Sequence, residues 1–115
     1  MKLSVTTLLT TVAKFSQPVP GTNEWREVEI KIDLEMPSKE ELADPKFLQM
    51  GDLKILDRVL KRVHDVETDD VDADGNPLTA LEVVKRNHYA SGGVTRAFLE
   101  ALGHDQREYQ RKNSN

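Results

Sequence analysis

Polar and apolar residues alternate most regularly between residues 26 and 36, where every second position is apolar. A period of two predicts a β-strand with one buried face and one exposed face. The stretch from Leu3 to Phe15 is rich in threonine, valine and leucine, as a partner strand would be, and turn-forming residues separate the two. The pattern therefore predicts an antiparallel β-hairpin. The apolar positions of its second strand are Val28, Ile30, Ile32, Leu34 and Met36.

Beyond the hairpin, the spacing of apolar residues changes to three and four, which is the period of a helix. Ser38 and Glu41 match a capping box, so a short helix is expected to begin there. A longer amphipathic helix is expected from Asp52, and its spacing continues as far as Val63. The apolar positions of this second helix are Leu53, Leu56, Val59, Leu60 and Val63.

Two more helices are expected in the last third of the chain. Thr79 and Glu82 repeat the capping pattern, and the helix that they open should reach about Asn87. We expect Gly92 and Gly93 to break the chain before a last helix, which Gly103 is suited to end. The apolar stripe of this last helix comprises Val94, Ala97, Phe98, Ala101 and Leu102.

These elements predict a single α+β domain over residues 1–115. In this interpretation an N-terminal antiparallel β-hairpin, residues 1–36, packs on a small bundle of three to four short α-helices within residues 38–103. Residues 104–115 form a polar tail. A chain of 115 residues with 37% hydrophobic content is suited to one modest core.

Composition narrows the classes of function. A formal net charge of -4 argues against a broad basic surface for nucleic acid. The chain has no cysteine, which excludes disulfides, thiolate zinc sites and cysteine nucleophiles. The segment from Leu3 to Ala13 contains too many threonines for a signal peptide, and no apolar run reaches membrane-spanning length. We expect a cytoplasmic protein without a targeting segment.

An acidic segment between residues 65 and 74 is the strongest candidate for a metal site. Asp70, Asp72 and Asp74, followed by Gly75, match the opening of a calcium-binding EF-hand loop. The twelfth position of such a loop supplies a bidentate carboxylate, but here it is Leu81. The pattern therefore favours a solvated acidic turn, and we expect no bound metal or other cofactor.

Catalytic chemistry has little support in this sequence. The three histidines, at positions 64, 88 and 104, lack the one-turn spacing that places two imidazoles on one helical face for a metal. No nucleophile elbow surrounds Ser91, and Gly92 and Gly93 match no phosphate-binding fingerprint. We expect a protein that is not an enzyme.

A resemblance to a known family rests on the order of these elements. A strand ending at residues 32–36, a polar helix start at 38–42, an amphipathic helix and the turn containing Asp74, Gly75, Asn76 and Pro77 follow one another. The chain closes with residues 94–102 and the basic residues 111–113. In this order, residues 12–113 resemble the tail assembly chaperones of long-tailed, siphovirus-type bacteriophages.

The resemblance implies a non-catalytic chaperone that acts in the cytoplasm of the infected host and is absent from the mature virion. Its partners would be the phage tape measure protein, which it coats, and the tail tube protein, which it helps to recruit. Many members also have a longer form made by a ribosomal frameshift near the end of the gene. Codons for residues 111–113 that form an A-rich slippery heptamer would point to the same arrangement here.

Two surfaces are candidates for contacts with partners. The first is the stripe of Val94, Phe98, Leu99 and Leu102 on the last helix, although a stripe at helical spacing more often faces a core. The second is the hairpin, whose edges would pair between copies to make a homo-oligomer. Two alternative functions also remain open, a small calcium-responsive binding module around Asp70–Asp74 and an acidic decoy of a nucleic-acid-binding protein.

Overall fold

The predicted hairpin is present and forms most of a three-stranded antiparallel sheet. Strand β1 (Thr7–Pro18) pairs with β2 (Trp25–Met36) over their whole length. A third strand, β3 (Leu60–His64), pairs with the other side of β2, so the sheet order is β1-β2-β3. A turn closes the hairpin, and Gly21 lies within it at φ 77°, where glycine carries no steric penalty. The computed structural model describes residues 1–113, with side chains as far as residue 103.

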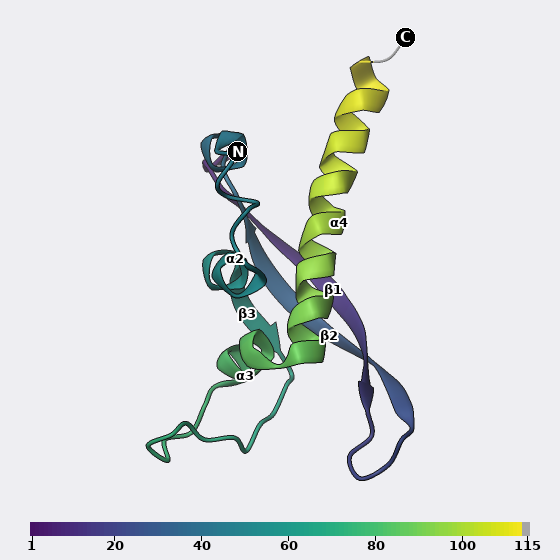
Figure 1. Ribbon diagram of the computed structural model, residues 1–115. Coiled ribbons are helices and arrows are strands. Elements are labelled where there is room, and N and C mark those ends of the chain that lie inside the picture. Colours follow the sequence, from purple (N-terminus) through teal and green to yellow (C-terminus); the bar gives the residue numbers. More distant parts are fainter. Residues whose placement is uncertain (114–115) are drawn as a thin grey trace.

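Four helices complete the fold and confirm the α+β class. They are α1 (Lys39–Ala43), α2 (Asp52–Val59), α3 (Ala80–Arg86) and α4 (His88–Asn113). Figure 1 shows α2, α3 and α4 against one face of the sheet, and the C-terminal half of α4 extends past the rest of the molecule. We call the face of the sheet that these helices pack against the covered face, and the opposite one the open face.

One hydrophobic core lies between the covered face and the helices. Alternation along β2 turns its apolar residues towards the core, as predicted, and the intervening charged residues mostly towards solvent. Helices α2, α3 and α4 contribute the opposite side of the core. The buried apolar residues are Ala13, Ile30, Ile32, Leu34, Phe47, Ile55, Leu56, Val59, Leu60, Val84, Ala90, Val94 and Phe98.

The helix predicted from Asp52 is shorter than expected, because α2 ends at Val59 and strand β3 (Leu60–His64) follows directly. The sequence prediction is wrong here for a physical reason. Residues three apart normally face opposite sides of a strand, but Asp33 and Leu34 pair with Arg62 and Leu60, which leaves Lys61 as an extra residue. This bulge turns both Leu60 and Val63 towards the core and so imitates the spacing of a helix.

In the same region, the structure also corrects one residue that was predicted to lie in the core. Leu53 was expected on the buried stripe, yet its side chain is 55% exposed. Ile55 is buried in its place, together with Leu56 and Val59. Because α2 has only eight residues, its orientation is set by where the chain enters β3, and the buried side of the helix is rotated from the side that the longer pattern suggested.

The last helix begins earlier and ends later than predicted. Helix α4 runs without a break through Gly92, Gly93 and Gly103, and its backbone is helical as far as Asn113. The break falls instead at Asn87, which ends α3 and whose Oδ1 accepts hydrogen bonds from the backbone N–H groups of Tyr89 (3.0 Å) and Ala90 (2.9 Å). The predicted polar tail, residues 104–115, is therefore helical to Asn113, and residues 114 and 115 lie outside the described residues.

Candidate functional site

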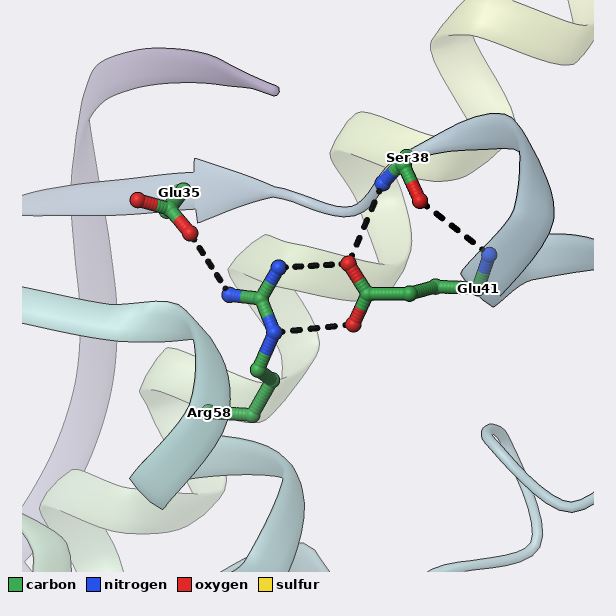
Figure 2. Close-up of polar contacts among 4 residues, drawn as sticks. All are labelled: Glu35, Ser38, Glu41 and Arg58. Carbon is green, nitrogen blue, oxygen red and sulfur yellow. Dashed lines mark hydrogen bonds and ion pairs between the residues drawn. The ribbon is translucent and has the colours of Figure 1, made fainter. Parts of the chain in front are cut away.

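A polar junction ties the start of α1 to β2 and α2. The Ser38 side chain accepts from the Glu41 N–H (3.2 Å), and the Glu41 carboxylate accepts from the Ser38 N–H (3.3 Å), which confirms the predicted capping box. Figure 2 shows the Arg58 guanidinium reaching from α2 to both oxygens of Glu41 and to Glu35. With three carboxylate contacts of 2.6–2.9 Å, this junction is suited to fixing the corner of the fold.

A second polar cluster lies on the open face and links all three strands. Asp33 on β2 accepts a hydrogen bond from the Thr10 hydroxyl of β1 (2.7 Å), and His64 Nε2 of β3 lies 3.1 Å from the same oxygen. Cross-strand pairs of this kind stabilise a sheet. The threonine hydroxyl donates a hydrogen bond to the carboxylate, and the Asp33 side chain thereby connects β2 to both neighbouring strands.

We expect acid to destabilise the protein through these two clusters. The Arg58 hydrogen bonds hold the pKa of Glu41 below its ordinary value of 4.5, and the Thr10 hydroxyl, followed by His64, holds the pKa of Asp33 below 3.8. A carboxylate with a lowered pKa in the folded state contributes stability that is present above its unfolded pKa and is lost as the pH falls through the folded value. The free energy of unfolding should therefore decrease between roughly pH 5 and pH 3.

Urea unfolding at several pH values measures this dependence. Glu41→Gln keeps the shape of the side chain but does not ionise, so this variant should lose less stability over the same interval than the original chain does. An equal loss in both proteins would show that the Arg58–Glu41 pair makes no contribution to the acid response.

The acidic segment forms a tight turn between β3 and α3. The Gly75 N–H donates to the Asp72 carbonyl (3.0 Å), and Gly75 adopts φ 82°, as expected for a turn that ends in a left-handed residue. Asp72 Oδ1 accepts from the N–H groups of Asp74 and Asn76, both at 2.9 Å, and the backbone hydrogen bond of Asn76 is the main reason that the pKa of Asp72 is lowered. One carboxylate oxygen of Asp72 is thus used to hold the turn.

Asp70 and Asp74, the other two members of the candidate calcium loop, have exposed side chains. Within the described part of the chain, no three histidine, aspartate or glutamate side chains gather closely enough to hold a metal ion. The same stretch contains no helix with the length and apolarity needed to cross a membrane.

The predicted partner-binding residues of the last helix divide into two groups. Val94 and Phe98 are completely buried in the core, and Leu102 packs partly against it. Leu99 is 49% exposed. A helix covering a sheet directs its apolar side inwards, so Leu99 is the most exposed of the four in the folded chain, and binding of a partner by this stripe stays a prediction.

A hollow in the surface lies elsewhere, where the hairpin extends beyond the helices. An open groove of about 560 Å³ runs between the outer part of the hairpin and the first turns of α4. Phe15 and Val28, which are directly paired across the strands, lie at its floor on the covered face and are only partly buried. Its lining residues are Lys14, Phe15, Ser16, Glu27, Val28, Glu29, His88, Tyr89, Gly92 and Arg96.

Aromatic side chains stand beside this groove. Trp25, which is 60% exposed, meets Tyr89 edge to face with ring centroids 5.6 Å apart, and Tyr89 also meets His88 at 5.1 Å. Exposed aromatic residues of this kind are enriched where proteins bind one another. Charges of both signs surround the floor, including the Lys14–Glu29 pair at 3.7 Å. The arrangement offers an apolar floor with a mixed polar rim.

Sequence reasoning missed this groove because it combines residues 14–16 and 27–29 of the hairpin with residues 88–96 of α4, which lie far apart in the sequence. One local signal was available. Two adjacent glycines inside an otherwise helical segment suggest a break when they are considered alone, but they equally allow a helix to approach another element closely. Gly93 lets α4 approach Lys14 and Phe15 closely. Gly92 lines the groove, and because it has no side chain the space beside it stays empty.

Comparison with known protein families, characterised proteins and solved structures finds no match to this chain.

Proposed function

We propose that this protein is a non-catalytic tail assembly chaperone of a long-tailed bacteriophage. It binds the tape measure protein and helps to recruit tail tube subunits in the host cytoplasm, and it leaves before the virion is complete. The order of elements that carries the resemblance to this family supports the proposal. A frameshifted longer form of the same chain is part of the proposal and is tested by the nucleotide sequence that encodes residues 111–113.

The observation that carries the proposal is the groove between the hairpin and α4. Its floor of Phe15 and Val28 belongs to the covered face, yet the helices of the chain leave it partly open. An amphipathic helix binds such a groove by inserting apolar side chains from one face. The tape measure protein, as the resemblance describes it, is long and largely helical with apolar seams, so many copies of this chain would cover it along its length.

The shape of the groove favours contacts that release readily. It is open to solvent on one side, and its rim carries the exposed charges of Lys14 and Glu29. Each copy would bury little apolar surface, so strong coating would come from many weak sites acting together along the tape measure. Weak individual contacts allow the tail tube to displace the chaperones one after another.

Gly92 offers a direct test of the groove. A Cβ placed at this position meets nothing within 4 Å, so a larger side chain can enter the groove without disturbing the core. Gly92→Leu is expected to weaken binding of helical tape measure segments by about 10-fold or more, since excluding one or two apolar side chains costs about 1.5–3 kcal/mol. Isothermal titration calorimetry with purified segments measures this change.

Gly92→Ala is the matched control, because it makes the same backbone change and leaves most of the groove empty. It should bind the segments as the original chain does. Equal affinity of the leucine and alanine variants, with both folded by circular dichroism, would remove the groove from the proposal. Failure of the original chain to bind any tape measure segment would overturn the proposed function itself.

A further inference from the structure

The free edge of strand β1 is an unusual feature of this sheet. The sheet order places β1 at an edge, and the stretch from residue 3 to residue 13 contains no charged residue and no proline. A long, uncharged edge strand rich in threonine, valine and leucine presents unpaired backbone groups to another chain. The opposite edge strand, β3, has only five residues and includes Lys61 and Arg62, which discourage such pairing.

Helix α4 limits how much of the β1 edge is free. Arg96 Nη1 donates to the Lys14 carbonyl at 3.2 Å, so this carbonyl points away from β2 and already has a partner. Gly93 approaches the same carbonyl so closely that an added Cβ would lie 2.9 Å from it. The edge from Lys14 onwards is thus occupied, and the stretch that remains for another strand is residues 7–13.

The direction of the Lys14 carbonyl also identifies which backbone groups of β1 face outwards. In an antiparallel strand, successive residues direct their backbone groups to alternate sides. The groups of Leu8, Thr10 and Val12 therefore point to the same free edge as that of Lys14. The side chains of Leu8 and Val12 stand on the open face of the sheet, where they are 58% and 44% exposed.

We propose that two copies of this chain associate by antiparallel pairing of their β1 edges over residues 7–13, with the two-fold axis at Thr10. Leu8 then lies opposite the partner's Val12, and Val12 opposite the partner's Leu8. The four side chains form one apolar cluster on the open face, and the three residue pairs exchange about six backbone hydrogen bonds. The two sheets join into one continuous sheet.

Charge and occupied surface disfavour axes at Leu8 and Val12. The registers between them, with the axis at Leu9 or Thr11, would set Leu8 opposite the partner's Thr10 or the partner's Lys14 and so leave it without an apolar partner. A two-fold axis at Leu8 would bring Lys2 opposite the partner's Lys14, which places like charges together. An axis at Val12 would require the edge beyond Lys14, which Arg96 and α4 cover. The axis at Thr10 sets Lys14 opposite the partner's uncharged Thr6 and matches apolar residues with apolar residues.

The size of the contact implies a reversible dimer. Seven residues of paired strand lie below the roughly 1,200–2,000 Å² that stable complexes bury, so association should depend on concentration in the micromolar range or above. This pairing uses a different surface from the groove beside α4 and does not depend on tape measure binding.

Two double variants test the register, and they differ only in the sign of one charge. In L8K/V12E the new lysine lies opposite the partner's new glutamate at both ends of the interface, and within each chain the new charges face Glu35 and Lys31, which have the opposite sign. In L8K/V12K, lysine lies opposite lysine across the interface. Sedimentation equilibrium of the purified chain alone should give a dimer dissociation constant at least about tenfold higher for L8K/V12K than for L8K/V12E.

Leu99→Glu is a control, since Leu99 is similarly exposed but lies on α4, and this variant should associate like the original chain. Circular dichroism verifies that every variant is folded at the temperature of the measurement. Equal dissociation constants for the two double variants, or a monomeric original chain at millimolar concentration, would overturn the proposed pairing. Because no tape measure protein is present, either result leaves the test of the groove unaffected.

Discussion

Phe98→Ala is expected to lower the free energy of unfolding by about 3–5 kcal/mol, the largest effect of any single substitution that we consider. Phe98 is the largest fully buried side chain in the described part of the chain, and its ring lies in the core between the sheet and the helices. Removing it leaves a cavity that the surrounding strands and helices fill only partly. Since domains of this size have about 5–15 kcal/mol of stability, much of the margin would be lost.

Leu99→Ala is the matched control at the next position. Leu99 is 49% exposed, so truncating it removes little buried surface and should cost less than about 1 kcal/mol. Urea denaturation followed by circular dichroism gives both values under the same conditions. Similar losses of stability at the two positions would contradict the burial of Phe98 and the exposure of Leu99 on α4. Phe98 would then again be a residue available to a partner.

Gly93→Ala is expected to destabilise the protein by about 1–2 kcal/mol, although alanine normally favours a helix. An added Cβ would lie 2.9 Å from the Lys14 carbonyl oxygen and 3.0 Å from the Phe15 Cβ. Overpacking of this kind costs about 1–3 kcal/mol, which exceeds the gain of up to about 1 kcal/mol from better helix propensity. The helix must move away from β1 to accommodate the methyl group.

Gly92→Ala should have the opposite sign and raise the free energy of unfolding by about 0.5–1 kcal/mol. Both glycines lie in α4, but Gly92 has open space where Gly93 meets β1. Thermal unfolding of the two variants beside the original chain measures the contrast. If Gly93→Ala also stabilised the protein, the close contact between α4 and β1 would be incorrect.

The hairpin and the two capped helix starts were predictable because their signals are local. Alternation along β2 lies within one element, and the capping pairs Ser38 with Glu41 and Thr79 with Glu82 are three residues apart. Hydrogen bonds from the Glu41 and Glu82 N–H groups to the capping side chains confirm both helix starts. Contacts over such short distances are formed by the same residues whatever the rest of the chain does.

The boundary between α2 and β3 was not predictable in the same way. Leu60 and Val63 fit a continuing helix, and only their pairing with β2 across a bulge shows that they belong to a strand. The end of α3 had a local signal in Asn87, whose side chain caps the next helix, but the neighbouring glycines gave a stronger and misleading one. Glycine marks a break in one context and a close contact in another.

In the candidate sites, too, local sequence patterns differ from what contacts between distant segments produce. Asp70, Asp72 and Asp74 matched the start of a calcium loop by spacing, whereas their geometry is that of a turn in which Asp72 binds backbone N–H groups. Val94 and Phe98 formed an apolar stripe that the sequence could not assign to a core or to a partner. The groove beside α4 combines residues 14–16, 27–29 and 88–96, which no local pattern connects.

By itself, the sequence determined the α+β class, the hairpin with its buried face, the capped helix starts and the acidic turn, because each depends on residues within a few positions of one another. The tertiary structure alone decided that residues 60–64 form a strand and that α4 continues through its glycines. It also decided that the groove beside α4 and the edge of β1 are left uncovered by the rest of the chain. These features depend on which distant segments cover one another. A local pattern indicates which face of an element is apolar, but which other segments cover that face, and how completely, is a property of the packing.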